Sequence, residues 1–337
     1  MSYYDGRYPH SGESRRYFFR AKYQWIAPIA LLECMMKHKL PSPVRTVCYA
    51  GVTIALTLVP ALAHGAPAQN LVPPVARQMA PARAPHLATH RAVYRLTLSK
   101  TTAGSSINDM RGKLVYDFQG SACRGYTLKT RLITEVIDRE GTPSINDIHS
   151  KSWEDARGSR FRFQTMQYTD GKLAESTKGS ARRLRRRPHT VAIRLVKPKR
   201  ARLRLTGNIL FPTQHSLTLL KAALAGKTRV QADIYEGSEN GTKKYETSSL
   251  IGAPLELSAN SQLPVIKNAG ALDSLPSWPV VVSYYEPASQ KDGLPAYEIS
   301  FRMYANGVSR KLKLDYGVFS LDGELTSIEF LEPKPCR

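Results

Sequence analysis

Alternating apolar and polar positions run through most of the chain after residue 89. In residues 112–118, Leu114, Tyr116 and Phe118 share one side of an extended segment, and Lys113 and Asp117 lie on the other side. A period of two is typical of a strand that buries one face. The same pattern predicts strands at residues 93–99, 126–138, 150–155, 160–168, 172–178, 191–196, 200–205, 228–235, 243–250, 280–285, 297–304, 309–316 and 324–330.

One segment has the period of a helix. Within residues 208–226 an apolar side chain recurs at helical spacing, at Leu217, Leu220 and Leu224. Thr213 is the predicted cap at the start of this helix, and Gly226 lies where a glycine ends one. His215 in the first turn is a candidate ligand or base, although a histidine in such a place is more often a packing or capping residue.

The order of these elements indicates the fold class. No helix separates successive strands, which favours an antiparallel all-β domain over an α/β domain. A sheet of about a dozen strands tends to curl or close. Residues 254–278 contain prolines and serines with weak periodicity and are predicted to form a loop.

The N-terminal region has the three-part layout of a secretory signal. Residues 47–59 are apolar and uncharged. They follow a basic flank formed by Lys37, His38, Lys39 and Arg45. Residues 61–63 fit the small-x-small cleavage pattern, and the apolar run is shorter than the roughly 20 residues of a spanning helix.

These features predict four parts of the chain. Residues 1–35 are an over-extended start or a cytoplasmic tail, and residues 36–63 are a signal peptide cleaved after Ala63. Residues 64–88 form a flexible lead rich in proline and alanine, and residues 89–337 form a single domain. An uncleaved anchor is the alternative to cleavage. We therefore expect an exported protein.

The four cysteines fall into two groups. Cys34 and Cys48 precede or lie within the apolar N-terminal run, whereas Cys123 and Cys336 lie beyond it, with no C-x-x-C pair and no zinc-type spacing. If the mature protein is exported, Cys123 has one possible partner, Cys336. Cys123 as a nucleophile is the alternative, and it needs a histidine partner. In an oxidising compartment a disulfide is the simpler interpretation.

The sequence contains none of the common catalytic motifs. A G-x-S-x-G elbow, a Walker loop, G-x-G-x-x-G and H-E-x-x-H are all absent. The eight histidines are scattered, and His86 and His90, four apart, have no third ligand nearby. We therefore predict a protein that is not an enzyme and uses no metal or other cofactor. A hydrolase with an unrecognised site is the remaining alternative.

The chain is strongly basic, with a formal net charge of +22. Such a charge suits an anionic neighbour such as lipid headgroups, lipopolysaccharide, peptidoglycan or nucleic acid. The basic residues peak at Arg182, Arg183, Arg185, Arg186 and Arg187. This segment is either an anion-binding patch or a loop of solvated charges followed by the outward face of a strand. Nucleic-acid binding is not expected, because it needs stacking aromatics among the basic residues and the segment has none.

Several blocks together resemble the cell-envelope-integrity protein EipB family of Gram-negative bacteria. The blocks are HRAVYRLTL at 90–98, GKLVYDFQGSACRGYT at 112–127, FRFQT at 161–165, ILFPTQH at 209–215, DIYEGSENG at 233–241, VVVSYYEP at 280–287, YEISFRMYANGVSRKLKLDYGVFSLDGEL at 297–325, and the terminal Cys336. The resemblance covers the whole predicted domain. No single block is catalytic, and it is their order and number that make the resemblance specific.

The resemblance implies more than the residues do alone. Such proteins are periplasmic, and their antiparallel sheet coils into a β-spiral around a helix, similar in shape to lipoprotein-carrier proteins of the outer-membrane pathway. The family's disulfide maps onto Cys123 and Cys336. Loss of a family member compromises envelope integrity, and a periplasmic tetratricopeptide-repeat protein is an implied partner. The arginine-rich segment 182–187 and the long N-terminal lead depart from the family pattern.

Two hypotheses for the function follow. In the first, a non-enzymatic periplasmic protein supports envelope integrity by binding a protein partner or an apolar, lipid-like ligand within the curled sheet. In the second, a basic surface scaffold binds anionic envelope polymers or lipopolysaccharide. We expect a monomer in both cases.

Overall fold

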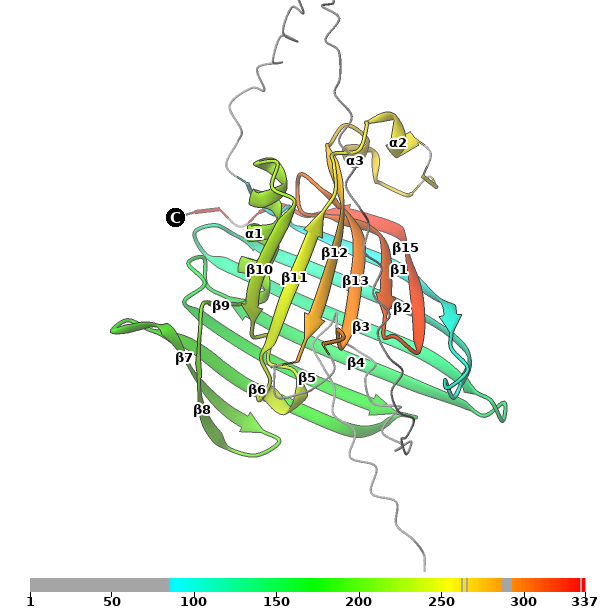
Figure 1. Ribbon diagram of the computed structural model, residues 1–337, viewed down its shortest axis with the longest axis horizontal. Helices are drawn as coiled ribbons and strands as arrows, with labels where there is room; N and C mark the ends of the chain where they lie inside the picture. Colours follow the sequence, from blue (N-terminus) through cyan, green and yellow to red (C-terminus); the bar gives the residue numbers. More distant parts are fainter. Residues whose placement is uncertain (1–84, 262, 265, 287–292, 334, 337) are drawn as a thin grey trace, which may run out of the picture.

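The computed structural model describes residues 85–261, 263–264, 266–286, 293–333 and 335–336 (Figure 1). The predicted signal peptide, its cleavage after Ala63 and nearly all of the predicted lead lie outside the described residues. The family-type domain can therefore be followed from the last residues of the lead to its C-terminal cysteine.

The described residues form a mainly β structure (Figure 1). The strands are β1 His90–Thr101, β2 Ile107–Ser121, β3 Gly125–Asp138, β4 Pro143–Glu154, β5 Arg160–Thr169, β6 Lys172–Leu184, β7 Arg187–Lys197, β8 Ala201–Thr206, β9 Ile209–Leu210, β10 Arg229–Ile234, β11 Tyr245–Ile251, β12 Ser277–Tyr285, β13 Tyr297–Tyr304, β14 Ser309–Asp315 and β15 Phe319–Phe330. The helices are α1 Pro212–Leu224, α2 Ser258–Ser261 and α3 Gly270–Asp273, with a 3-10 turn, η2, at Glu239–Gly241.

All these strands belong to one sheet, in the order β8-β7-β6-β5-β4-β3-β2-β1-β15-β14-β13-β12-β11-β10-β9. The first eight strands form an antiparallel meander, and so do β10 to β15. The two meanders join where β1 pairs with β15, so the first and last strands of the domain lie side by side in the sheet. This arrangement confirms the predicted all-β, mainly antiparallel fold.

The two edges of the sheet are close in sequence. β8 ends at Thr206 and β9 begins at Ile209, yet the two strands are at opposite ends of the strand order. The sheet therefore has to curl until its edges approach. The guanidinium of Arg183 in β6 spans the gap by donating to the Ile209 carbonyl at 2.5 Å. The result is a curled, barrel-like sheet, as predicted, with one parallel strand pair, β9 and β10, that the pattern did not predict.

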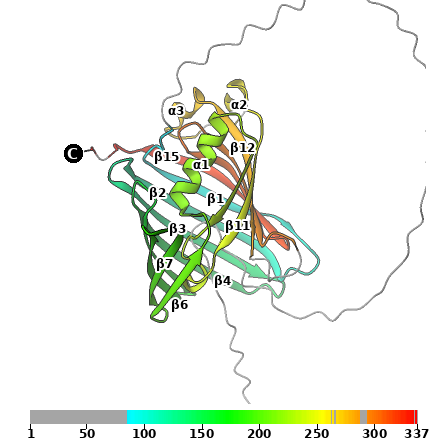
Figure 2. The ribbon, with the colours of Figure 1, turned by 60° about the vertical axis from the view of Figure 1, so that its left-hand side comes forward.

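Helix α1 lies between the two halves of the curled sheet (Figure 2). It is shorter than the predicted 208–226, and Thr213 does not cap it. Instead, the carboxylate of Glu154 in β4 accepts hydrogen bonds from the backbone N–H groups of Thr213, at 2.7 Å, and Gln214, at 3.1 Å. Gly226 follows the last turn, as predicted. The cap prediction was wrong because the capping side chain comes from a distant strand.

Other boundaries also differ from the pattern. β4 begins at Pro143, where a strand was predicted only from residue 150, and β2 begins at Ile107 instead of residue 112. The apolar residues of these extensions are three positions apart, at Ile107 and Met110 and at Ile145 and Ile148, so they show no period of two, but the backbones pair with neighbouring strands. The predicted loop at 254–278 contains the short helices α2 and α3.

The core follows the inner face of the sheet. The largest cluster packs Leu219 and Leu220 of α1 against strands of the second meander, including Trp278 and Met303. A second cluster lies under β1 to β4 and includes Leu272 of α3. A third lies under β5 to β9 and contains stacked aromatic rings. These clusters hold the curl and leave the outer face of the sheet to polar residues.

Candidate functional site

The turn between β2 and β3 holds the disulfide. Gly120 and Gly125 flank it with φ of 143° and 79°, values that residues with a side chain rarely adopt. A Cβ at Gly120 would also lie 2.2 Å from the Gly125 carbonyl oxygen, so this tight turn requires glycine. Cys123 lies within the turn and is bonded to Cys336, with Cα atoms 5.8 Å apart. The disulfide confirms the pairing that the family resemblance implied.

The five predicted anion-binding arginines lie together at a neighbouring turn. Arg182 and Arg183 are near the end of β6, Arg187 begins β7, and Arg185 and Arg186 form the two-residue turn between these strands. All of them are exposed except Arg183, which is partly buried and binds the Ile209 carbonyl. The cluster is therefore a hairpin tip on the outside of the barrel.

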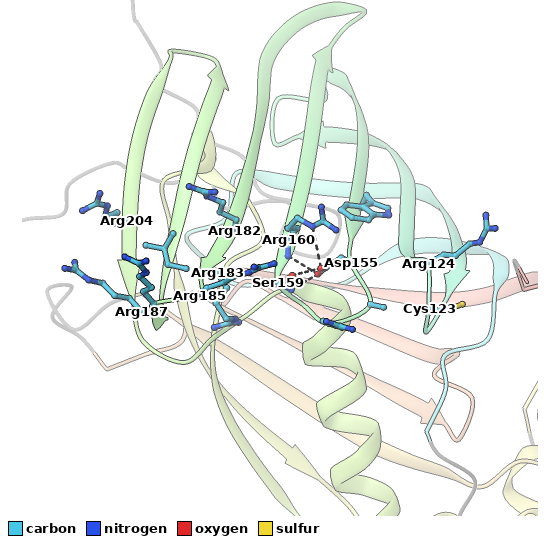
Figure 3. Close-up of a pocket in the computed structure, with 15 residues that line it drawn as sticks. Cys123, Arg124, Asp155, Ser159, Arg160, Arg182, Arg183, Arg185, Arg187 and Arg204 are labelled. Carbon is cyan, nitrogen blue, oxygen red and sulfur yellow. Dashed lines mark hydrogen bonds and ion pairs between the residues drawn. The ribbon is translucent and has the colours of Figure 1, made fainter. Parts of the chain in front are cut away.

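Tertiary structure adds further arginines to this tip. A groove of about 1070 Å³ runs from the tip to the disulfide turn, and we call it the arginine groove (Figure 3). Besides the five predicted residues it is lined by four arginines from other loops and strands, Arg124, Arg157, Arg160 and Arg204. Cys123 lies at the end of the groove away from the hairpin tip (Figure 3). The disulfide thus fixes one wall of the groove.

Asp155 is the acidic residue that lines the arginine groove. Its carboxylate accepts hydrogen bonds from Ser159 N–H at 2.5 Å and Arg160 N–H at 2.9 Å, and from the Ser159 hydroxyl. Burial raises the pKa of Asp155, but these hydrogen bonds outweigh burial and hold the pKa below its ordinary value. The carboxylate is therefore ionised at neutral pH and engaged with its own loop, and the groove keeps a large excess of positive charge.

Trp153 is the aromatic residue of the groove lining. Its ring lies 5.1 Å from the guanidinium carbon of Arg162 and 5.8 Å from that of Arg160. Both contacts are within cation–π range. The ring therefore holds two arginines close together.

A second, separate cavity lies inside the barrel. It has a volume of about 160 Å³ and is bounded by α1 and by strands of both meanders. We call it the interior cavity. Its lining is largely aliphatic and aromatic, and includes Tyr94, Phe118, Leu219, Tyr284 and Met303.

Buried polar groups also face the interior cavity. His215 of α1 lines it, is only 6 % exposed, and has no hydrogen-bond partner for its Nε2 atom. Burial lowers the pKa of His215 to about 4, so the ring is neutral at physiological pH. His90 also lines the cavity, and burial lowers its pKa too. The cavity is thus an apolar space with an unsatisfied imidazole nitrogen beside it.

Only part of these sites could be predicted from the amino-acid sequence. The five clustered arginines are visible as a run, but Arg124, Arg157, Arg160 and Arg204 join them only through strand pairing. The apolar members of the interior cavity follow the ordinary alternation of a buried strand face, which does not distinguish a cavity wall from a filled core. In the sequence, His90 was a possible metal ligand without a third ligand nearby. In the structure it lies at the start of β1, where its ring stacks on the Tyr116 ring.

Two kinds of feature are absent from the described residues. Among these residues no helix combines the length and the apolar character needed to cross a bilayer. No group of three histidine, cysteine, aspartate or glutamate side chains suited to a metal ion occurs in the part of the chain that the structure describes.

Comparison with known proteins gives consistent matches. A model of the EipB-like family matches residues 81–332. The chain is 34% identical over 251 residues to the cell envelope integrity protein EipB of Brucella abortus (strain 2308). This alignment covers 74% of this chain and 87% of that protein. A crystal structure of a beta-barrel-like protein with a domain of unknown function from Brucella abortus aligns with a TM-score of 0.68 and 32% identity, covering 73% of this chain and 99% of that one.

Proposed function

This chain belongs to the EipB-like family, and from that premise we propose that it supports the integrity of the cell envelope. The location that fits this role is the periplasm. The disulfide between Cys123 and Cys336 supports that location, because structural disulfides persist in oxidising compartments and are rare in the cytosol. The role proposed is binding, not catalysis.

The molecular activity that the geometry supports best is binding of a slender apolar ligand in the interior cavity. The cavity itself is the observation that carries this proposal, since it lies inside the barrel between α1 and both meanders. Its volume of about 160 Å³ is small beside the roughly 300–1,000 Å³ of pockets for drug-sized ligands. Such a space takes a short segment of one acyl chain, with a polar group of the ligand near the unpartnered Nε2 of His215.

Lipid analysis tests this proposal directly. Protein purified natively from an envelope fraction should carry lipid that mass spectrometry detects, and it should bind a fluorescent fatty acid. Ser152 lines the cavity from β4, so Ser152→Trp should fill part of the space and weaken fatty-acid binding about tenfold. Ser106→Trp, at an exposed loop position outside the cavity lining, is the matched control. Lipid-free native protein together with equal binding by both variants would contradict the proposal.

A second candidate function is binding of anionic envelope polymers or lipopolysaccharide. The arginine groove is the specific observation that favours it. The groove has a volume of about 1070 Å³, and its lining contains nine arginines and a single carboxylate. Binding should weaken steeply with salt, since exposed charges are screened within about 10 Å at 0.1 M salt. Neutralising Arg185, Arg186 and Arg187 together should weaken binding of purified lipopolysaccharide. The matched control is the same loss of charge at the exposed Lys100, Lys113 and Lys172.

A protein partner also belongs to this proposal. The family resemblance implies a periplasmic tetratricopeptide-repeat protein, and affinity capture from an envelope extract is the measurement that identifies such a partner. We propose a monomer, which light scattering of the purified protein checks. A stable dimer at micromolar concentration would contradict it.

A further inference from the structure

Six arginines lie in two rows on the outer face of β5 to β8. We propose that the space between these rows binds a linear anionic glycan, one whose carboxylate or phosphate groups repeat along a single chain. This inference rests on the second candidate function, and it assigns the polymer a different surface from the hairpin tip. We call the space the outer furrow.

The strand register places the arginines in rows. In the first row, Arg160 of β5 pairs with Arg182 of β6, which pairs with Ala192 of β7, which pairs with Arg204 of β8. Figure 3 labels the three arginines of this row, which lie on β5, β6 and β8. The first row therefore crosses four strands with three guanidinium groups.

The second row lies two residues along each strand. Arg162 of β5 is opposite Ser180 of β6, which is opposite Arg194 of β7, which is opposite Arg202 of β8. Two residues of extended chain separate the rows by about 7 Å, and four neighbouring strands span about 14 Å. All six arginines are exposed. The two rows are therefore parallel lines of cations.

A cavity lies between the two rows of arginines. Its volume is about 830 Å³. The residues between the rows, Phe161, Ala181 and Ile193, are buried and belong to the inner core cluster. The floor therefore consists of backbone atoms, the small side chains Ser180 and Ala192, and the partly buried Leu203. The arginines form the walls.

The charges of the furrow contrast with the rest of the same sheet. Arginines on the outer face of β1 to β3 pair with carboxylates on adjacent strands, as in Arg91–Asp117 at 2.7 Å, Arg95–Glu324 at 2.6 Å, Arg111–Glu135 at 2.5 Å and Arg131–Asp147 at 2.8 Å. In the furrow, Arg160 approaches Asp155 at 3.6 Å. The structure shows no ion pair from the other five to any described residue.

This contrast points to an external anion. Like charges directly opposite on paired strands destabilise a sheet, and the furrow contains two such pairs, Arg160 with Arg182 and Arg194 with Arg202. A bound chain of carboxylates or phosphates would relieve the repulsion between these arginines. Its oxygens would accept paired hydrogen bonds from the guanidinium N–H groups. The like-charge pairs therefore lower the stability of the sheet, and no carboxylate opposite them in the sheet compensates for this loss.

The shape of the furrow selects the class of ligand. Cations arranged in two lines over about 14 Å match an extended chain and not a compact headgroup. Chains of bases are usually held by several stacked aromatic rings. The aromatic ring beside the rows in the described structure is Trp153, and its contacts are with Arg160 and Arg162. An anionic glycan therefore fits better than a nucleic acid.

Binding measurements on the full chain test this inference. The probes are polygalacturonate for the carboxylate arm and poly(glycerol phosphate) for the phosphate arm. The double variant Arg194→Ser/Arg202→Ser should bind at least one probe about tenfold more weakly at low salt, with a shallower salt dependence. The monomers galacturonate and glycerol phosphate should bind neither protein, because the furrow recognises a chain.

Two further variants separate the furrow from the groove. The control, Lys100→Ser/Lys113→Ser, removes the same charge at exposed positions outside both linings and should change probe binding less than about threefold. The tip variant, Arg185→Ser/Arg186→Ser, should weaken probe binding less than Arg194→Ser/Arg202→Ser does. If only the tip variant weakens binding, the furrow inference is wrong while the second candidate function stands. If neither the furrow variant nor the tip variant weakens binding, both are wrong. Tighter binding of a single-stranded thymidine decamer than of both polymers would overturn the choice of glycan. Arg194→Lys/Arg202→Lys, which keeps the charge, should have an intermediate effect.

Discussion

At the scale of single residues, Glu154 is a buried carboxylate that holds the start of α1. It is 2 % exposed and accepts two backbone N–H bonds from the first turn. Burial raises the pKa of Glu154 to about 7, although the hydrogen bonds from Thr213 and Gln214 oppose the rise. The side chain therefore acts as a helix cap whose charge depends on pH near neutrality.

The pH dependence of stability tests this assignment. A carboxyl group whose folded pKa is raised from 4.5 to about 7 stabilises the fold fully below about pH 4.5 and loses that contribution as pH rises through 7. The change is about 3 kcal/mol in the free energy of unfolding. Glu154→Gln should remove this dependence. Urea unfolding of both proteins between about pH 4.5 and 8 measures it, and parallel profiles would contradict the assignment.

His215 lies in the first turn of α1, which Glu154 caps, and its effect on the pH dependence of stability should have the opposite sign. Its pKa is lowered from 6.5 to about 4, so its neutral form contributes stability above about pH 6.5 that is lost as pH falls through 4. His215→Leu should remove that loss, and the variant should therefore be less sensitive to acid than the parent. Thermal unfolding at about pH 4 and pH 7 checks the difference. An unchanged acid sensitivity would show that the ring is solvated in the folded protein.

At the scale of elements, the disulfide ties the C-terminal segment to the β2–β3 turn. It closes a span of 213 residues, for which the chain-entropy model gives about 5 kcal/mol as an upper value. Cys336→Ser should lower the free energy of unfolding by about 2–5 kcal/mol. Guanidinium unfolding of the oxidised parent and the variant gives the value. Adding reductant should lower the free energy of unfolding of the parent toward that of the variant and leave the variant's value unchanged. A loss below about 0.5 kcal/mol in Cys336→Ser would mean that the disulfide does not stabilise the fold.

Repulsion across β7 and β8 makes a separate prediction. Arg194 and Arg202 are directly opposite each other. Arg202→Glu replaces this like-charge pair with an opposite-charge pair, which should raise the free energy of unfolding by about 0.5 kcal/mol at low salt. The gain should vanish in about 1 M salt because exposed pairs are screened. Arg200→Glu, outside both strands, is the control, and an equal gain there would indicate a general effect of net charge.

Local elements could be predicted from the sequence where their cause is local. The strands and the end of α1 at Gly226 depend on neighbouring residues. The cap of α1 could not be predicted, because Glu154 lies 59 residues before Thr213 in the chain. The outer furrow depends on strand register, and alternation alone does not align Arg162 with Arg194.

At the scale of the whole molecule, one curled sheet separates two environments. The inner face packs around α1 and leaves the interior cavity, and the outer face of β5 to β8 carries the furrow. Adjacent residues of one strand serve both faces: Ser152 lines the cavity, while Trp153 contacts the furrow arginines outside. The resemblance to a β-spiral family indicated the curl, but the position of the arginines relative to the cavity required the three-dimensional structure.

This separation predicts that the two proposed ligands bind independently. Ser152 on β4 and Arg194 on β7 lie on strands three places apart, about 14 Å across the sheet. Effects of changes so far apart usually add within about 0.5 kcal/mol, roughly twofold in affinity. Ser152→Trp should therefore weaken fatty-acid binding and leave polygalacturonate binding unchanged, and Arg194→Ser/Arg202→Ser should do the reverse. The combined variant should show both losses at their single-variant size, as measured by titration calorimetry. If filling the cavity also weakened glycan binding about tenfold, the inner and outer faces would instead hold parts of one amphiphilic ligand, because a rigid sheet with two separate sites gives no such coupling.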